Sequence, residues 1–151
     1  MSALTDTCPA GATSGQLATF RLDGDLYGVE VEHVQEVLRS QKLTRVPLAP
    51  TAVAGLINLR GQVVTAIELR ERLGRKPRPE GTDAVVIVVR LHGEAVSLLV
   101  DSIADVVDVD ATDFETPPDT LEGPARELIR GAYKLQGQLL LALDVHKAVS
   151  A

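Results

Sequence analysis

Hydrophobic and polar residues alternate along short stretches of this chain, and glycine-containing turns separate the stretches. The segment Leu17–Asp23 alternates and runs into Asp23–Gly24–Asp25, a sequence typical of a β-hairpin turn. Gly55–Arg60 and Val63–Leu69 predict a second hairpin, in which glycine at the first position of the Gly61–Gln62 turn favours type II′ geometry. Two further hairpins are predicted in the second half of the chain, namely Ala84–Leu91 with Glu94–Val100 and Leu128–Leu135 with Gln138–Leu143.

The hydrophobic period changes between Val31 and Arg39. Val31, Val34 and Leu38 would fall on one face of a helix, so this segment predicts a short amphipathic helix. With a rotation of about 100° per residue, Glu36 points nearly opposite that face. We therefore expect Glu36 to face solvent.

Short strands, glycine turns and few helices are typical of an all-β fold with a few short helices. Two groups of about five strands predict two small barrels packed together, because closing a small sheet hides its unpaired edges. The pattern does not fix how the chain crosses between the two barrels. Residues 1–16 are small, polar and nearly uncharged, and we expect them to form a disordered N-terminal tail before a domain at 17–151.

The amino-acid composition and net charge limit the kinds of partner that the chain can bind. Aromatic residues make up only 3% of the 151 residues, so the core is built from aliphatic side chains. The net charge of −6 argues against nucleic acid as a partner, because phosphate binding needs a basic face. The apolar runs are too short to cross a bilayer and the N-terminus is no secretory signal, so we expect a cytoplasmic protein without direct membrane insertion.

The residues that usually carry metal or catalytic chemistry are sparse. Cys8 is the only cysteine, which excludes an internal disulfide, and His33, His92 and His146 lie more than fifty residues apart, so no metal site is expected. The acidic stretch Asp101–Glu115 lacks the spacing of a calcium loop. No phosphate-binding loop, nucleophile elbow or zinc-protease motif is present. We expect no enzyme and no cofactor, only a small β-rich binding module.

Several segments in sequence order resemble the bacterial chemotaxis coupling protein (CheW) family, from about Leu17 to Val149. They are FRLDGDLYGVEV, VQEVL, TRVPLAP, GLINLRG, IELRERLG, VVIVV, LLVD and LLLALDV. The resemblance implies two five-stranded SH3-like barrels with a shared hydrophobic centre. It implies a non-catalytic adaptor of two-component signal transduction, which couples chemoreceptor cytoplasmic tips to the regulatory domain of a chemotaxis histidine kinase at membrane-associated receptor arrays.

The same resemblance implies which residues bind the partners. The V-Q-E motif of the family falls on Val34 and Glu36, and its N-L-R-G motif falls on Asn58, Arg60 and Gly61. A groove between the barrels is expected to take the receptor helical hairpin, with Val34 giving apolar contact and the two charged residues setting its register.

Two alternatives stay open at this point. Departures from the family pattern at Thr65, Glu68 and Ser97 leave room for a paralogous coupling protein of a non-motility chemosensory pathway. A small-ligand-binding β-barrel is a second alternative, although the sequence shows no polar cluster to hold a ligand.

Overall fold

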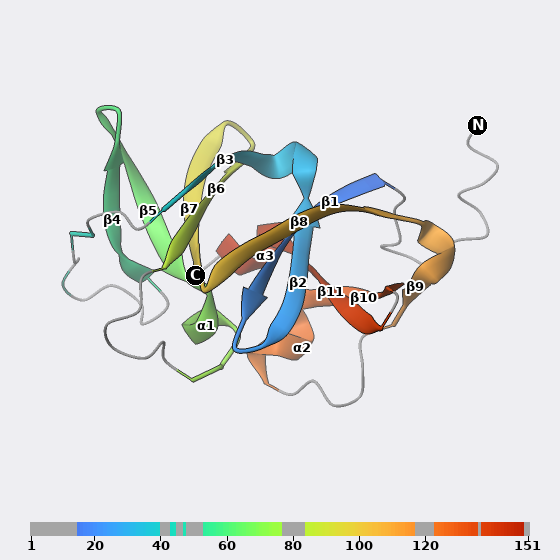
Figure 1. Cartoon of the computed structure of the whole chain (residues 1–151). Helices are drawn as coiled ribbons and strands as arrows, with labels where there is room; N and C mark the ends of the chain where they lie inside the picture. Colours follow the sequence, from blue (N-terminus) through green and yellow to red (C-terminus); the bar gives the residue numbers. More distant parts are fainter. Residues whose placement is uncertain are drawn as a thin grey trace.

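Strands dominate the structure, a computed structural model that describes residues 15–39, 43–44, 47, 53–76, 84–116, 123–135 and 137–149 (Figure 1). The strands are β1 (Gly15–Leu22), β2 (Asp25–Glu30), β3 (Val34–Leu38), β4 (Val53–Leu59), β5 (Gln62–Glu68), β6 (Val85–Leu91), β7 (Glu94–Val100), β8 (Ser102–Val109), β9 (Phe114–Glu115), β10 (Ile129–Leu135) and β11 (Gln138–Leu143). Short helices lie between them: the 3₁₀ helices η2 (Val31–His33) and η3 (Ala111–Asp113), and the α-helices α1 (Leu69–Arg72), α2 (Pro124–Leu128) and α3 (Val145–Val149).

The strands form two sheets, as expected for two lobes. The five-stranded lobe has the strand order β3-β6-β7-β5-β4, and the six-stranded lobe has the order β8-β1-β2-β11-β10-β9. The sixth strand, β9, contributes only two residues. The all-β fold with a few short helices is confirmed, and the larger sheet has one short strand more than predicted.

The two lobes share one topology, although the chain passes through it from different starting points. In chain order, the five-stranded lobe uses β3, β4, β5, β6 and β7, with β5 parallel to β7. Reading the other lobe as β8, β10, β11, β1 and β2 gives the same sheet order, with β11 parallel to β2. The six-stranded lobe is therefore a circular permutation of the other, which explains why strand spacing alone did not reveal the crossover.

The equivalent strands also share a sequence repeat. The stretch Gly55–Leu69 reads GLINLRGQVVTAIEL, and the stretch Gly131–Val145 reads GAYKLQGQLLLALDV. Each stretch covers most of a hairpin and the first residue of the helix that follows it, and each has a register shift at its first glycine. The two lobes thus repeat one local design, with matched glycines and matched aliphatic positions.

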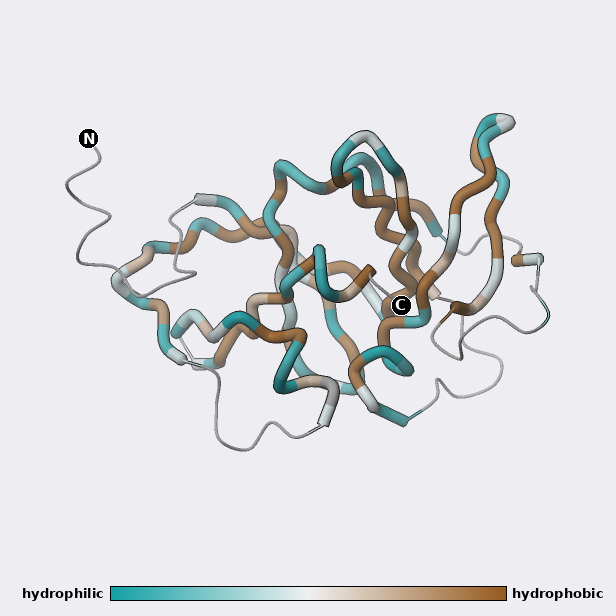
Figure 2. Tube along the Cα trace, turned by 180° about the vertical axis from the view of Figure 1, so that it is seen from behind, coloured by the Kyte–Doolittle hydropathy of each residue, from teal (hydrophilic) through white to brown (hydrophobic). Residues whose placement is uncertain are grey.

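One hydrophobic core joins the lobes. Its largest cluster of buried residues takes Phe20 and Tyr27 from the six-stranded lobe together with Ile87, Leu98 and others from the five-stranded lobe. Hydrophobic stretches run through the strands, while hydrophilic residues concentrate at the turns (Figure 2). Each lobe has a smaller cluster of its own behind this shared centre. Burial on both sides of the inner strands accounts for their nearly continuous apolar runs.

A buried ion pair ties α1 to the connection between the lobes. Arg70, whose side chain is only 8% exposed, donates from Nε to Asp101 Oδ1 at 2.8 Å and also bonds Asp101 Oδ2. Asp101 lies between β7 and β8, and its Oδ2 accepts a hydrogen bond from the backbone N–H of Asp23 in the β1–β2 turn at 2.9 Å. One carboxylate therefore holds elements of both lobes together.

Two segments differ from the sequence-based expectation. The helix predicted from Val31 to Arg39 is wrong: only η2 is helical there, and Val34 to Leu38 forms β3, which pairs with β6. The strand β1 includes Gly15 and Gln16 from the segment predicted as a tail. Residues 1–14, the rest of that segment, lie outside the described residues.

Candidate functional site

Glu36 lies on β3, the outermost strand on one side of the five-stranded lobe. Val34 pairs with Val89 and Glu36 pairs with Val88, so Gln35 is an extra residue on this strand, as in a β-bulge. The side chain of Glu36 is 18% exposed, which is less than expected for a residue facing solvent. An arginine from the opposite side of the sheet covers part of its carboxylate.

That arginine is Arg60, at the turn between β4 and β5. Arg60 and Gly61 are the two central residues of the turn and have φ angles of 52° and 85°. Positive φ at both positions is the signature of a type I′ turn, so the predicted type II′ turn at Gly61–Gln62 is wrong by one residue. Asn58 Oδ1 accepts the backbone N–H of Gly61 at 3.0 Å and braces the turn.

Glu36 and Arg60 form a bidentate ion pair. Arg60 Nη1 lies 2.8 Å from Glu36 Oε2, and Arg60 Nη2 lies 2.8 Å from Glu36 Oε1. This parallel geometry is the strongest form of arginine–carboxylate contact. The hydrogen bonds from Arg60 hold the pKa of the Glu36 carboxyl below its ordinary value, and they raise the pKa of Arg60. The arginine side chain is nevertheless 77% exposed, so its outer face is accessible to a partner.

Sheet curvature brings these two distant residues together. β3 and β4 lie at opposite sides of the five-stranded sheet, and the chain beyond β3 returns to pair with β4 through the bridge between Thr44 and Leu56. The backbone bonds of this bridge measure 2.9 and 2.7 Å. The Glu36–Arg60 ion pair is a second contact between these two sides of the sheet, made by side chains.

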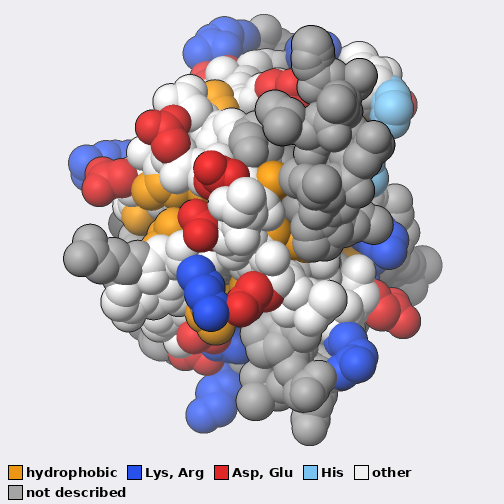
Figure 3. Space-filling view, turned by 90° about the vertical axis from the view of Figure 1, so that its right-hand side faces the viewer, with side chains coloured by type: hydrophobic (Ala, Val, Ile, Leu, Met, Phe, Trp, Pro, Cys, Tyr) orange, Lys and Arg blue, Asp and Glu red, His pale blue; other side chains and the backbone are white. Residues whose placement is uncertain are grey.

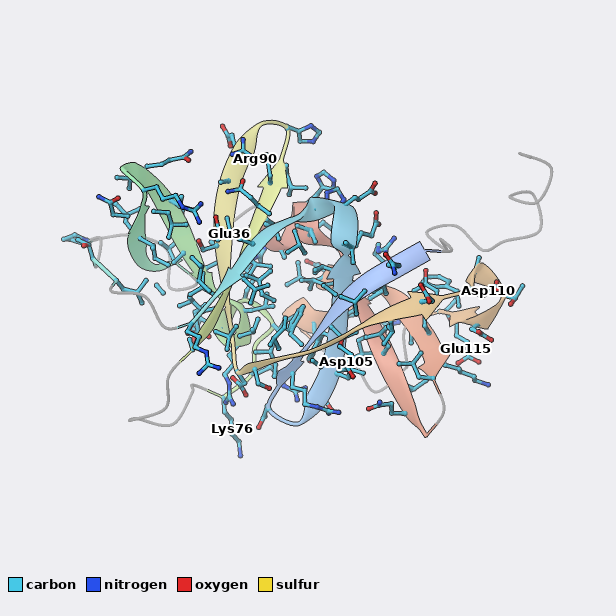
Figure 4. The ribbon with its side chains drawn as sticks, turned by 45° about the horizontal axis from the view of Figure 1, so that its top comes forward. Glu36, Lys76, Arg90, Asp105, Asp110 and Glu115 are labelled. Carbon is cyan, nitrogen blue, oxygen red and sulfur yellow. The ribbon has the colours of Figure 1, made fainter. Side chains whose placement is uncertain are left out.

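Sequence reasoning missed the polar residues that extend this pair. Arg90 on β6 donates from Nε to Gln35 Oε1 at 2.8 Å, and Gln35 reaches Glu36 Oε2 at 3.5 Å. Figure 4 shows Arg90 and Glu36 near one another on adjacent strands. A row of polar side chains therefore runs from β6 across β3 to the β4–β5 turn.

A groove lies between the lobes, beside β3. It has a volume of about 430 Å³ and is lined by Val37, Leu38, Arg39, Ala84, Val85, Ser102 and Ile103. Val37 and Ile103 are 40% and 42% exposed, and Val106 further along β8 is 55% exposed. Val34, expected to supply apolar contact, is instead half-buried and packs against the shared core. Val37 has that exposed position because strand alternation, rather than helical period, governs this segment.

The structure thus brings together four of the five residues expected to bind partners. Glu36, Asn58, Arg60 and Gly61 meet at the β4–β5 turn. Val34 lies on the same strand as Glu36 and faces the core.

Comparison with known proteins gives consistent matches over this fold. The family model of the CheW-like domain matches residues 16–151. The chain is 31% identical over 140 residues to the chemotaxis protein CheW of Treponema pallidum, covering 90% of this chain and 82% of that protein. It is 31% identical to the chemotaxis protein CheW of Bacillus subtilis, covering 89% and 86% of the two chains. The crystal structure of the scaffolding protein TtCheW from Thermoanaerobacter tengcongensis superposes with a TM-score of 0.81 at 27% identity, over 92% of this chain and 94% of that one.

The chain belongs to the CheW-like domain family. The SH3-like character of its two lobes and its role as a coupling scaffold in chemotaxis are thereby confirmed at the level of the family. The chain belongs to a family of scaffold proteins, and it is therefore described as non-catalytic. Within the described residues, no helix is long and apolar enough to span a bilayer.

The ion pair predicts a pH dependence that can be measured at Glu36 itself. Its folded pKa is depressed, so the pair stabilises the turn above the ordinary carboxyl pKa of about 4.3 and loses that effect as the pH falls through the folded value. In an Arg60→Gln variant we expect the pKa of Glu36 to rise toward its ordinary value, because the hydrogen bonds that lower it are lost. Side-chain carboxyl NMR titration measures this, and an unchanged pKa in the variant would show that the bidentate pair does not form in solution.

Proposed function

We propose that this chain couples the cytoplasmic tips of chemoreceptors to the regulatory domain of a chemotaxis histidine kinase. In this role the protein works in the cytoplasm and is recruited to membrane-associated receptor arrays. The observation that carries the proposal is the surface Glu36–Arg60 pair, whose glutamate lies on β3, the strand that contributes Val37 and Leu38 to the groove between the lobes.

The groove and the ion pair together suit a receptor helical hairpin. A helix that docks in a groove needs apolar contacts along its length and charged contacts that set its register. Val37 and Ile103 offer the apolar contacts. Only two of the five N–H donors of Arg60 bond to Glu36, and no other partner of this guanidinium occurs in the described part of the chain. The remaining donors suit a carboxylate on the receptor.

The contact with the kinase is proposed at the hairpin tips of the two lobes, one of which also carries Arg60. Val63, at the tip of the β4–β5 hairpin, is 62% exposed, and Leu139, its equivalent in the repeat, is 43% exposed. The β4–β5 hairpin projects from the body of the molecule in Figure 1. These exposed aliphatic residues at matched positions of the two lobes can supply apolar contacts to a kinase domain of the same fold.

Co-sedimentation tests the proposal. Membranes that contain the receptors and the histidine kinase of the same organism are mixed with and without this protein, and the kinase in the pellet is measured. We expect the kinase to sediment with the membranes only when the protein is present. Equal sedimentation in its absence would contradict the coupling function and leave the fold assignment intact.

A further inference from the structure

All three histidines of the chain lie at one place in the structure. His33 belongs to η2, His92 to the turn between β6 and β7, and His146 to α3. The ring centroids of His33 and His146 are 5.7 Å apart, and those of His92 and His146 are 5.2 Å apart. Histidine side chains appear close together at the edge of the face shown in Figure 3. The three histidines are far apart in sequence, but the fold brings His33 and His92 each close to His146.

The two ring separations that involve His146 are close to those of imidazoles that share one metal ion. In a tetrahedral zinc site the metal–nitrogen distance is about 2.0 Å, which places the ring centroids about 5.2 Å from one another. His92 and His146 are exposed, and the side chain of His33 is 24% exposed, so small rotations can turn their nitrogens toward a common point.

A carboxylate lies beside the histidines. Glu30, Glu32 and His33 hold their ligand atoms within 4.8 Å of one another. Glu30 Oε2 lies 3.7 Å from His33 Nε2, a separation close to that of two ligands on one metal. The other oxygen of Glu30 lies 3.5 Å from Arg130 Nη1, so the arginine leaves Oε2 directed toward the histidine.

A small cavity lies beside Glu30, His33 and His146; Arg130 also lines it, and His92 lies outside its lining. The cavity has a volume of about 140 Å³, enough for an ion and its bound water. Nitrogen-rich ligand sets prefer zinc, nickel, cobalt or copper, whereas calcium and magnesium prefer sites made only of oxygen.

We propose that His33, His92 and His146, with Glu30 as the carboxylate ligand, bind one divalent transition-metal ion of the zinc class. The three histidines come from different parts of the fold. His33 lies between β2 of the six-stranded lobe and β3 of the five-stranded lobe, His92 lies in the five-stranded lobe, and His146 follows β11 of the six-stranded lobe. A bound ion clamps the two lobes to one another, and it stabilises the folded chain in proportion to its occupancy.

Calorimetric titration of the metal-free full chain with zinc chloride tests the site. We expect one ion per chain and a melting temperature that rises by roughly 5 °C or more at a hundredfold excess over the dissociation constant. The variants His33→Gln, His92→Asn and His146→Gln should each weaken zinc binding at least about tenfold, because each removes one ligand. Asparagine is chosen at position 92 because His92 has a φ of 50°, which asparagine tolerates.

Two control variants separate this site from incidental binding. Cys8→Ser removes the only thiol of the chain, and Lys147→Gln alters the neighbour of His146 on α3. Both should retain the affinity of the wild-type chain. Wild-type affinity in any of the three histidine variants overturns the proposal, and so does the absence of saturable binding by the unaltered protein. Circular dichroism of every variant shows that a loss of binding is not a loss of fold.

Discussion

Arg60→Glu is expected to weaken binding of the receptor tip at least about tenfold while leaving the fold intact. The substitution places a carboxylate opposite Glu36, where the arginine now lies at 2.8 Å, and so replaces a bidentate attraction by repulsion. It also presents a negative charge to the partner. The fold should tolerate it, because the side chain of Arg60 is 77% exposed and contributes nothing to the core. Titration with a soluble receptor fragment measures the affinity, and thermal melting measures the fold.

Two further variants show which property of the pair matters. The swap Glu36→Arg with Arg60→Glu restores an ion pair in the opposite orientation. We expect the swap to restore the ion pair and not the binding, because the receptor contacts the exposed cation at position 60. Arg126→Glu is the matched control, since it makes the same charge change at an exposed position on α2. If Arg126→Glu weakens binding as much as Arg60→Glu, the effect comes from net charge and the Arg60 surface is not the receptor site.

Arg70→Ala is expected to lower the free energy of unfolding by about 3 kcal/mol, because it leaves a partly buried carboxylate without its cation. Asp101 is 24% exposed, and in the intact protein it takes two bonds from Arg70 and one from the backbone of Asp23. Urea unfolding measures the loss. The midpoint should fall with no change in slope if the two lobes still unfold together.

Arg72→Ala is the matched control for this experiment. Arg72 belongs to the same short helix and donates to the backbone carbonyls of Lys147 and Ala148, and it is only half-buried. We expect its removal to cost about 1 kcal/mol. If Arg70→Ala is no more costly than Arg72→Ala, the buried pair does not hold the lobes together.

The hairpins were predicted well from the sequence because each hairpin is determined mainly by residues that are close together in the chain. Alternation and glycine turns depend on a few neighbouring residues, and all four hairpins occur close to the expected places. The segment from Val31 to Leu38 was mistaken for a helix because its apolar spacing also fits a helical face. Pairing with β6 decides the outcome there, and the extra residue at Gln35 disturbs the simple alternation that would have indicated a strand.

In the candidate site, the sequence indicated individual residues but not the contacts between residues that are far apart in the chain. Resemblance to the family selected Glu36 and Arg60, but it gave no sign that they form a pair. That contact depends on the closure of the five-stranded sheet between β3 and β4. The histidines likewise meet only after two lobes and three separate elements have assembled. Distances across a curved sheet cannot be derived from the spacing of residues along the chain.

The permuted topology of the six-stranded lobe has a consequence for the order of events during synthesis. Strands β3 to β7 are contiguous, so the five-stranded lobe can pair as soon as this stretch has left the ribosome. The hairpin of β1 and β2 is made before this stretch, yet Leu26 finds its partner Leu140 only after β11 has been made. The early hairpin must therefore wait with part of its apolar surface uncovered. Assembly is expected to begin in the middle of the chain, with the first and last strands joining it together.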